Sequence, residues 1–323
     1  MSDKTGIEWT DATWNPVTGC SKVSQGCKHC YAEREWPRMT KLVPAYAGRD
    51  FTDVRCHPER LDQPLRWKKP RKVFVNSMSD LFHEAIPEDF ILSVFVTMAA
   101  ARQHTFQVLT KRPDRMRDLL TRWRNSGLVL REGCGVNLRN VWLGVSVEDQ
   151  ATADERIPLL RATPAAVRWI SAEPLLGRVD LCETFGMWWN QTMNCFESSS
   201  SSGFNRNPNN QRETAIDWVV VGGESGPKAR PMHPAWARSL RDQCAAAGVP
   251  FLFKQWGEWI GADQEECPIG PPASRWMWGD GTPFKYGDGQ SGHLPLLCRA
   301  GKKVAGRNRD GVKHDGYPQQ GDK

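Results

Sequence analysis

Short runs of apolar and β-branched residues recur along the first 255 residues, each bounded by polar or turn-forming residues. Most of these runs lack polar alternation, which is typical of strands buried on both faces. We therefore predict a first strand near residues 7–10, followed by buried strands over residues 72–76, 105–109, 141–147, 167–171, 217–221 and 249–253.

Helical periodicity separates these runs. Residues 87–102 begin with a proline suited to a first helical turn, and their apolar side chains form one stripe made of Phe90, Ile91, Val94, Phe95 and Met98. Gly248 is placed to cap the end of a helix over residues 234–247. The same kind of pattern predicts helices over residues 113–124 and 149–161.

Strand and helix alternate, which favours parallel β–α units. The predicted fold class is α/β, a partial or complete β/α (TIM-like) barrel, with an open doubly wound sheet as the alternative. We assign residues 1–256 to the barrel and residues 257–323, rich in Gly, Pro and Trp, to an irregular C-terminal extension. Residues 182–214 include five consecutive serines and are interpreted as a long surface insertion, and from Lys302 we expect a loosely ordered polar tail.

Composition limits the location and the partners that we expect for the protein. The longest apolar stretch, residues 91–101, is shorter than the roughly 18 to 20 residues that a membrane span needs. No basic segment followed by an apolar one opens the chain, so we expect a cytoplasmic location and no membrane partner. The net charge of +6 permits a polyanionic partner, and the 15 tryptophans suggest that some indoles line a site.

Ten cysteines without an export signal favour metal or redox chemistry over disulfides. Cys20, Cys27 and Cys30 form a C-x6-C-x2-C arrangement, and chain bends at Gly19 and Gly26 would let the three sulfurs converge. Three cysteines leave one iron of a 4Fe–4S cluster free to bind a ligand.

Two other interpretations of the cysteines remain open from spacing alone. Structural zinc takes four closed ligands, and Cys56 or His57 could complete such a set. The cysteines could also be unligated core residues. A Cys-X-X-Cys redox pair at Cys27 and Cys30 is less favoured, because no thioredoxin-like pattern surrounds it.

Polar residues follow every predicted strand. In a β/α barrel these strand exits form one face, where active sites lie, and the cysteine loop falls on the same face. Capping or solvated loop residues are the alternative interpretation for any single member. The exits contain Ser77, Ser79 and Asp80; Thr110, Lys111 and Arg112; Ser146, Glu148 and Asp149; Glu173; residues 222–226; and residues 254–256.

The three-cysteine loop after a first strand, followed by β–α units, resembles the radical S-adenosylmethionine superfamily over residues 7–259. WNPVTGC, CKHCYAER, FVNSMSDLFHE, VLTKRP, GVSVED, AEPLLG and VVGGESGP together resemble a phage-associated three-cysteine branch that also occurs in bacterial genomes. Thr110-Lys111 at one strand exit and Ser146 at the next are similar to spore photoproduct lyases, which repair DNA.

The sequence also departs from the superfamily pattern. The usual spacing is C-x3-C-x2-C, and the gap between Cys20 and Cys27 is wider. The Gly-Gly-Glu element that usually follows the second strand is replaced by residues 76–80. A Gly-Gly-Glu sequence occurs several strands later, so its usual role is not transferred to Glu224.

The resemblance implies two cofactors, a 4Fe–4S cluster held by Cys20, Cys27 and Cys30, and S-adenosylmethionine bound to the fourth iron. It also implies a one-electron donor such as flavodoxin or ferredoxin, and a 5'-deoxyadenosyl radical that abstracts hydrogen from a substrate. The candidate cofactor-binding residues are Ser77, Ser79 and Asp80 for the amine or ribose, Lys111 and Ser146 for the carboxylate, and the strand-exit residues Glu148 and Glu173.

A basic run directly before a predicted strand suggests a nucleic-acid partner, because it combines cations for phosphates with an aromatic ring for stacking. A solvated charged loop is the alternative. The run contains Arg66, Trp67, Lys68, Lys69 and Arg71. His83 is a candidate proton shuttle, or else a partly exposed histidine near a helix start.

The leading hypothesis is a radical S-adenosylmethionine enzyme that modifies or repairs a nucleic acid or nucleotide. The alternative is a zinc-stabilised nucleic-acid-binding protein without catalysis. The sequence assigns neither the substrate nor the residue that exchanges hydrogen with it, and it leaves the oligomeric state open.

Overall fold

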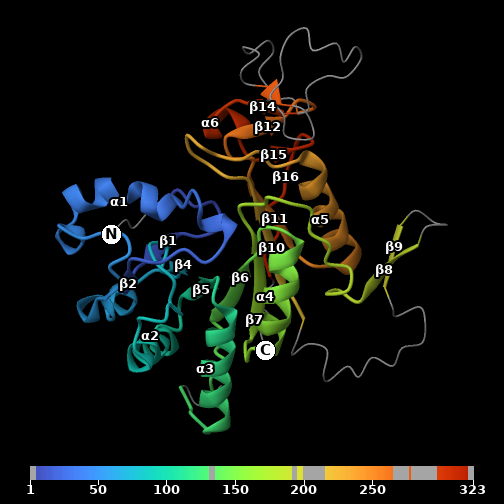
Figure 1. Ribbon diagram of the computed structural model, residues 1–323. Helices are drawn as coiled ribbons and strands as arrows, with labels where there is room; N and C mark the ends of the chain where they lie inside the picture. The colour runs from blue at the N-terminus through green and yellow to red at the C-terminus, as the bar shows by residue number, and fades with distance from the viewer. Residues whose placement is uncertain are drawn as a thin grey trace, which may run out of the picture. The chain divides into compact units, whose positions relative to one another are not determined.

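A computed structural model of the protein describes residues 5–130, 135–190, 195–198, 215–264, 276–277 and 297–318. Parallel strands and helices alternate along the chain, which confirms the predicted α/β class (Figure 1). The strands of the main sheet are β1 (Ala12–Trp14), β4 (Lys72–Val75), β5 (Thr105–Thr110), β6 (Val141–Ser146), β7 (Val167–Ala172), β10 (Trp218–Gly222) and β11 (Phe251–Gln255).

The order of these strands along the sheet is β1-β4-β5-β6-β7-β10-β11, the same as their order in the sequence. Neighbouring strands pair in parallel, with Ala12 opposite Val73 and Lys72 opposite Thr105. Among the described strands the order has two ends, β1 and β11, which agrees with a partial rather than a closed barrel. The carboxyl ends of successive strands therefore lie at one edge of the sheet.

Helices connect the strands at nearly the predicted positions. The predicted ones are α2 (Glu88–Ala100), α3 (Pro113–Asn125), α4 (Gln150–Ala162) and α5 (Pro234–Ala247). Gly248 caps α5 in the left-handed region, with φ 67°. A further helix, α1 (Tyr31–Leu42), was not predicted, because Pro37 inside it is typical of a helix end rather than an interior.

The first strand also differs from its prediction. Residues 7–10 form a turn closed by the Thr10 N–H and the Ile7 carbonyl at 3.3 Å, and the parallel pairing with β4 begins at Ala12. Trp9 in this turn is buried, so the apolar run near residues 7–10 reflects core packing rather than a strand.

Short elements complete the described chain. Those before β4 are β2 (Val17–Thr18), η1 (Gln25–Cys27), η2 (Pro44–Tyr46), β3 (Arg55–Cys56), η3 (Pro58–Arg60) and η4 (Gln63–Arg66). Those after β7 are β8 (Met187–Asn190), β9 (Cys195–Ser198), β12 (Trp259–Gly261), β13 (Trp276–Met277), β14 (Leu297–Arg299), α6 (Lys302–Ala305), β15 (Asn308–Arg309) and β16 (Val312–Lys313).

The chain divides into two compact units. The first contains residues 1–146, 154–170 and 205–217, and the second contains residues 147–153, 171–204 and 218–323. The sequence-based division into residues 1–256 and 257–323 stays a prediction. Much of the predicted insertion, at residues 191–194 and 199–214, lies outside the described residues.

The segment after Lys302 has more structure than the loosely ordered tail expected from its polarity. Arg309 is fully buried. The Phe253 N–H donates to the His314 carbonyl at 2.9 Å, and the Trp218 indole donates to the Gly316 carbonyl at 2.7 Å. These contacts attach residues up to 318 to β10 and β11 of the same unit, a tertiary effect that local composition does not encode.

The tryptophans whose side chains the structure describes lie mainly in the core. Trp9, Trp14, Trp142, Trp169 and Trp218 are each at most 2% exposed, so burial rather than a site explains much of their number. Several indole N–H groups donate to backbone carbonyls, as that of Trp14 does to Arg60 at 2.8 Å. A buried donor thereby keeps a partner without a polar side chain.

One close contact in the first unit gives a test of this packing. A methyl group added at Gly144 in β6 would lie 2.5 Å from the Trp169 indole. We expect Gly144→Ala to lower the free energy of unfolding by about 1–3 kcal/mol through overpacking, as measured by urea denaturation. Gly6→Ala is the control, because nothing lies within 4 Å of the added methyl. Equal stability of the two variants would contradict the close packing at Gly144.

Candidate functional site

A cavity in the first unit collects most of the residues predicted to bind metal or cofactor. Its empty volume is about 610 Å³, part of which is open solvent. The strand exits after β4 and β5 and the end of β6 contribute to it. The predicted residues that line it are Cys20, Cys27, Cys30, Ser77, Ser79, Asp80, Lys111 and Ser146.

The backbone around Cys20 is fixed by close packing. Gly19 has φ 89°, and a Cβ there would lie 2.3 Å from the Asp53 carbonyl oxygen, so the predicted bend at this glycine is present. The Cys20 N–H donates to the Phe51 carbonyl at 2.9 Å. Gly26, by contrast, lies within the 3-10 turn η1 rather than at a separate bend.

The third cysteine ends this loop at the start of α1. Cys30 is the N-cap residue, so Cys27 in η1 and Cys30 lie on consecutive helical turns. The hydroxyl of Tyr31 donates to the Ser77 carbonyl, which ties the start of α1 to the exit of β4.

Burial and nearby charges determine the protonation state of the thiols. Burial, and next the Asp80 carboxylate, raise the pKa of Cys20 to about 12, against the opposing effect of Arg112. Burial also raises the pKa of Cys30, against backbone hydrogen bonds and the Lys111 ammonium. Both groups therefore favour the protonated thiol until a cation replaces the proton.

The structure does not bring the fourth ligand of a closed zinc site to these cysteines. His57 uses both ring nitrogens elsewhere, with Nε2 2.8 Å from the Thr18 hydroxyl and Nδ1 3.1 Å from Glu59. Cys56 pairs with Val17 between β3 and β2, and neither Cys56 nor His57 lines the cavity. Within the described ranges, no three His, Cys, Asp or Glu side chains stand close enough to hold a metal ion as they are.

Asp80 connects two strand exits through its buried carboxylate. Oδ1 accepts from the Thr110 hydroxyl at 2.7 Å and from the Phe82 N–H at 3.0 Å. Oδ2 accepts from the Lys111 N–H at 3.0 Å and from Arg112 at 3.3 Å. Both oxygens thus have protein donors, which makes this side chain part of the frame of the site.

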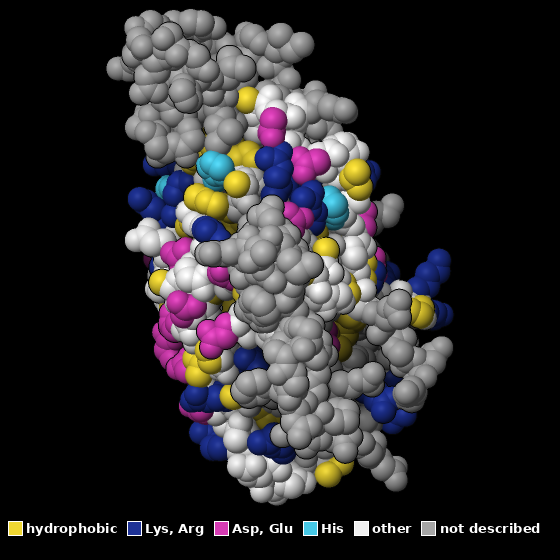
Figure 2. All heavy atoms as spheres, turned by 90° about the vertical axis from the view of Figure 1, so that its right-hand side faces the viewer, with side chains coloured by type: hydrophobic (Ala, Val, Ile, Leu, Met, Phe, Trp, Pro, Cys, Tyr) yellow, Lys and Arg dark blue, Asp and Glu magenta, His cyan; other side chains and the backbone are white. Residues whose placement is uncertain are grey.

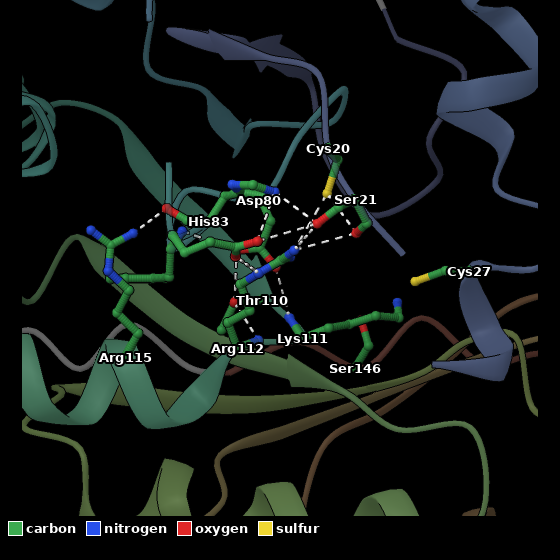
Figure 3. Close-up of polar contacts among 12 residues, drawn as sticks. Cys20, Ser21, Cys27, Asp80, His83, Thr110, Lys111, Arg112, Arg115 and Ser146 are labelled. Carbon is green, nitrogen blue, oxygen red and sulfur yellow. Dashed lines mark hydrogen bonds and ion pairs between the residues drawn. The ribbon is translucent and has the colours of Figure 1, made fainter. Parts of the chain in front are cut away.

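Arg112 extends this frame to the cysteine loop (Figure 3). Its Nη1 donates to the Cys20 sulfur at 3.8 Å, and its Nη2 donates to the Ser21 hydroxyl at 2.8 Å. The sequence places Arg112 at a strand exit, where its charge suggests a contact with phosphate rather than with the cysteine loop. The charge of Arg112 at a strand exit marked it as a candidate site residue. Its partner Cys20, 92 residues away in the sequence, could not be predicted from the sequence.

His83 is buried in the same network rather than partly exposed. The Ala85 N–H donates to its Nδ1 at 3.1 Å, so Nε2 carries the proton toward the Ser21 hydroxyl at 2.8 Å. Burial, and next the Arg112 charge, lower the pKa of His83. His83 is not among the residues that line the cavity, so it supports the cysteine loop from outside.

The two predicted serines after β4 also join backbone segments. The Ser77 hydroxyl donates to the Asn15 side-chain oxygen at 3.2 Å, and the Ser79 hydroxyl donates to the Val17 carbonyl at 2.9 Å. Asn76, which was not among the predicted site residues, lines the cavity, is 2% exposed and has φ 61°. Its Nδ2 has no hydrogen-bond partner among the described residues.

Glu148 and Glu173 belong to the second unit and do not line this cavity. The Glu173 carboxylate pairs with the Lys254 ammonium at 2.5 Å. Glu224 in the same unit is buried and accepts from the Arg230 guanidinium at 2.6 and 2.9 Å. Glu224 thus takes part in a buried ion pair within this unit.

The predicted nucleic-acid segment lies at the opposite end of β4 from the cavity. Residues 66–71 precede the first residue of this strand, whereas Asn76 to Asp80 follow its last residue. Lys68 and Lys69 are exposed, but the Arg71 guanidinium covers the Trp67 ring at 5.2 Å. Arg66 pairs with Asp62. The face in Figure 2 shows Lys and Arg interspersed with Asp and Glu where residues are described.

The described chain contains no helix long and apolar enough to cross a membrane.

The frame around Asp80 can be tested by substitution. We expect Asp80→Asn to lower the free energy of unfolding by about 1–3 kcal/mol, because the buried donors of Thr110, Lys111 and Arg112 lose a charged acceptor. Chemical denaturation measures this change. Glu84→Gln is the matched control, since the Glu84 side chain is 69% exposed and its loss changes stability by less than about 1 kcal/mol. An Asp80 variant as stable as this control would refute the frame.

Comparison with known proteins gives a family and two distant folds. A mutant of spore photoproduct lyase with serine in place of cysteine has a TM-score of 0.40 and 10% identity, over 89% of this chain and 71% of that chain. A mutant with phenylalanine in place of tyrosine has a TM-score of 0.36 and 10% identity, over 84% and 65%. No curated protein matches the sequence. The profile of a family described as "Protein of unknown function (DUF5131)" matches residues 4–318, and the chain therefore belongs to that family.

Proposed function

We propose that the protein is a radical S-adenosylmethionine enzyme that binds a 4Fe–4S cluster through Cys20, Cys27 and Cys30. The observation that carries this proposal is one cavity lined by three thiols and by polar residues from the exits of parallel strands. The motif resemblance to the superfamily supports the same assignment. The alternative of a closed zinc site has less support, because neither Cys56 nor His57 lines the cavity and both ring nitrogens of His57 contact other side chains.

The residues present fit the two cofactors in their donor chemistry. Thiolates are the ligands that iron–sulfur clusters take. The buried Nδ2 of Asn76 at the cavity has no partner among the residues with described positions, and such a donor is satisfied when a ligand supplies an acceptor. When bound and reduced, the cluster would supply the one electron that cleaves the carbon–sulfur bond of S-adenosylmethionine to methionine and a 5'-deoxyadenosyl radical.

The other residues of the cavity then bind and orient. Lys111 and Ser146 are proposed to hold the carboxylate of S-adenosylmethionine, and the Lys111 ammonium lies near enough to Cys30 to affect its pKa. The hydroxyl oxygens of Ser77 and Ser79 are proposed to accept hydrogen bonds from the amine or the ribose of S-adenosylmethionine. Asp80 holds the exits of β4 and β5 together. The enzyme needs an external one-electron donor such as flavodoxin or ferredoxin.

A nucleic acid or nucleotide is the proposed substrate. The exposed Lys68 and Lys69 support phosphate contacts. Val23 and Tyr31 line the cavity and are 46% and 42% exposed, which provides an apolar surface for a base at its mouth. Because residues 66–71 lie at the other end of β4, they would bind the polymer at a distance from the reacting nucleotide.

The cluster assignment predicts the effect of removing single cysteines. Cys20→Ala, Cys27→Ala or Cys30→Ala should remove most bound iron and abolish reductive cleavage of S-adenosylmethionine, because each loses one of three iron ligands. Iron and sulfide analysis of anaerobically purified protein measures the first effect, with about four of each expected per chain in the unsubstituted protein.

Cys56→Ala is the matched control and should keep both iron and cleavage activity. Loss of metal in this variant would indicate a four-ligand site and overturn the proposal. One tightly bound zinc without iron in the unsubstituted protein would instead establish the zinc-stabilised alternative.

The nucleic-acid assignment predicts a salt dependence. Replacing Lys68, Lys69 and Arg71 by Gln should make the slope of log binding constant against log salt shallower by about 0.7–0.9 for each phosphate that these cations neutralise. Fluorescence anisotropy with single-stranded and duplex DNA and RNA at several salt concentrations measures the slope. The control replaces Lys302, Lys303 and Lys313 of the second unit by Gln. An identical slope in both triple variants would remove residues 66–71 from the interface.

A further inference from the structure

The Arg112 guanidinium makes a contact that the proposed function does not assign. Arg112 directly precedes α3 and is 8% exposed. Its Nη1 lies 3.8 Å from the Cys20 sulfur, the first of the three proposed cluster ligands. The same residue donates to the carbonyl of Ser21 at 3.3 Å, so it holds both the cysteine and the backbone that follows it.

The guanidinium is held in one orientation by partners on several sides. Nε donates to Glu84 at 2.9 Å, Nη1 to Asp80 at 3.3 Å, and Nη2 to the Ser21 hydroxyl at 2.8 Å. Asp80 is itself fixed by the Thr110 hydroxyl. Such a planar fork keeps its direction, and a single ammonium could not satisfy these acceptors together.

The charges around Arg112 favour a further anion, such as a cysteine thiolate, next to its guanidinium. Asp80 is buried beside it, whereas the Glu84 side chain is 69% exposed and screened by solvent. A thiolate at Cys20 adds a further anion next to the guanidinium. In a buried setting a fixed positive charge stabilises added negative charge more strongly than in water.

We propose that Arg112 is a positioning residue that orients the Cys20 sulfur for the cluster and makes the bound cluster easier to reduce. This inference rests on the proposed cluster. Hydrogen bonds to ligating sulfurs and nearby charge are among the factors that set the reduction potential of an iron–sulfur cluster. A cation and an N–H donor at Cys20 both favour the reduced, more negative cluster.

The test compares the midpoint potential of the reconstituted cluster in three variants, measured by anaerobic redox titration with electron paramagnetic resonance of the reduced form. Arg112→Gln loses the charge and should shift the midpoint to a more negative potential. Arg112→Lys keeps the charge but lacks the planar fork whose other nitrogens contact Ser21 and Glu84. The charge is then less firmly oriented toward Cys20, and the midpoint should shift in the same direction by less. Iron content is measured in parallel.

Arg115→Gln is the matched control. Arg115 is close in sequence and also stabilises this region, but it donates to the backbone carbonyls of His83 and Ile86 and points away from Cys20 in Figure 3. Its variant should keep the midpoint of the unsubstituted protein. A shift as large as that of Arg112→Gln would show a general structural effect and overturn the inference.

The outcomes separate this inference from the proposed function. Failure of the unsubstituted protein to bind a four-iron cluster would overturn both. A normal cluster together with an unchanged midpoint in Arg112→Gln would overturn the inference alone. If Arg112→Gln does not fold, as judged by circular dichroism, Arg112→Lys decides, because a midpoint equal to that of the unsubstituted protein would overturn the inference.

Discussion

The candidate site depends on the hydrogen bonds that the buried carboxylate of Asp80 accepts. It accepts from Thr110, from the Lys111 backbone and from Arg112, and so joins the exits of β4 and β5. A buried carboxylate without donors is strongly unfavourable, so this arrangement resists displacement. Arg112 carries the connection on to Cys20, and the position of a proposed cluster ligand thereby depends on two strand exits rather than on its own loop alone.

A second set of constraints comes from the backbone of the cysteine loop. Gly19 packs against the Asp53 carbonyl where no side chain fits, and Tyr31 is tied to the Ser77 carbonyl. Asn15 accepts from both Ser77 and Met78, which holds the exit of β4 against the end of β1. The hydroxyls and carboxylate that the sequence offers as cofactor ligands are thus largely used to build the cavity. Asn76 has a buried Nδ2 without a hydrogen-bond partner among the residues whose placement is described, so this group is available to a ligand.

Residue composition was a weaker guide to function than residue spacing. The excess of tryptophan suggested a ring-lined site, but the described indoles are mostly core residues whose N–H groups donate to backbone carbonyls. The basic run at residues 66–71 precedes β4, so chain order alone places it at the end of the strand opposite the cavity. Cys20, Cys27 and Cys30, by contrast, line one cavity, although the described side chains of these cysteines do not stand close enough together to hold a metal ion as they are.

The sequence by itself determined the alternation of strands and helices in the main sheet. It also determined the limits of most strands of that sheet, and of α2 to α5, to within a few residues. It also determined which residues follow each strand. These features depend on local periodicity and on the preferences of proline and glycine, which act within a few residues of the chain. The exceptions were α1, where tertiary packing of Ala32 and Trp36 overrides the interior Pro37, and the turn at residues 7–10, where the buried Trp9 gives an apolar pattern like that of a strand.

Only the tertiary structure decided that Arg112 faces Cys20 and that Asp80 joins two strand exits. Asp80 and Thr110, 30 positions apart, meet because β4 and β5 pair in parallel and end side by side. Arg112 and Cys20, 92 positions apart, meet because the side chain of Arg112 reaches the cysteine loop, and no local pattern records either contact.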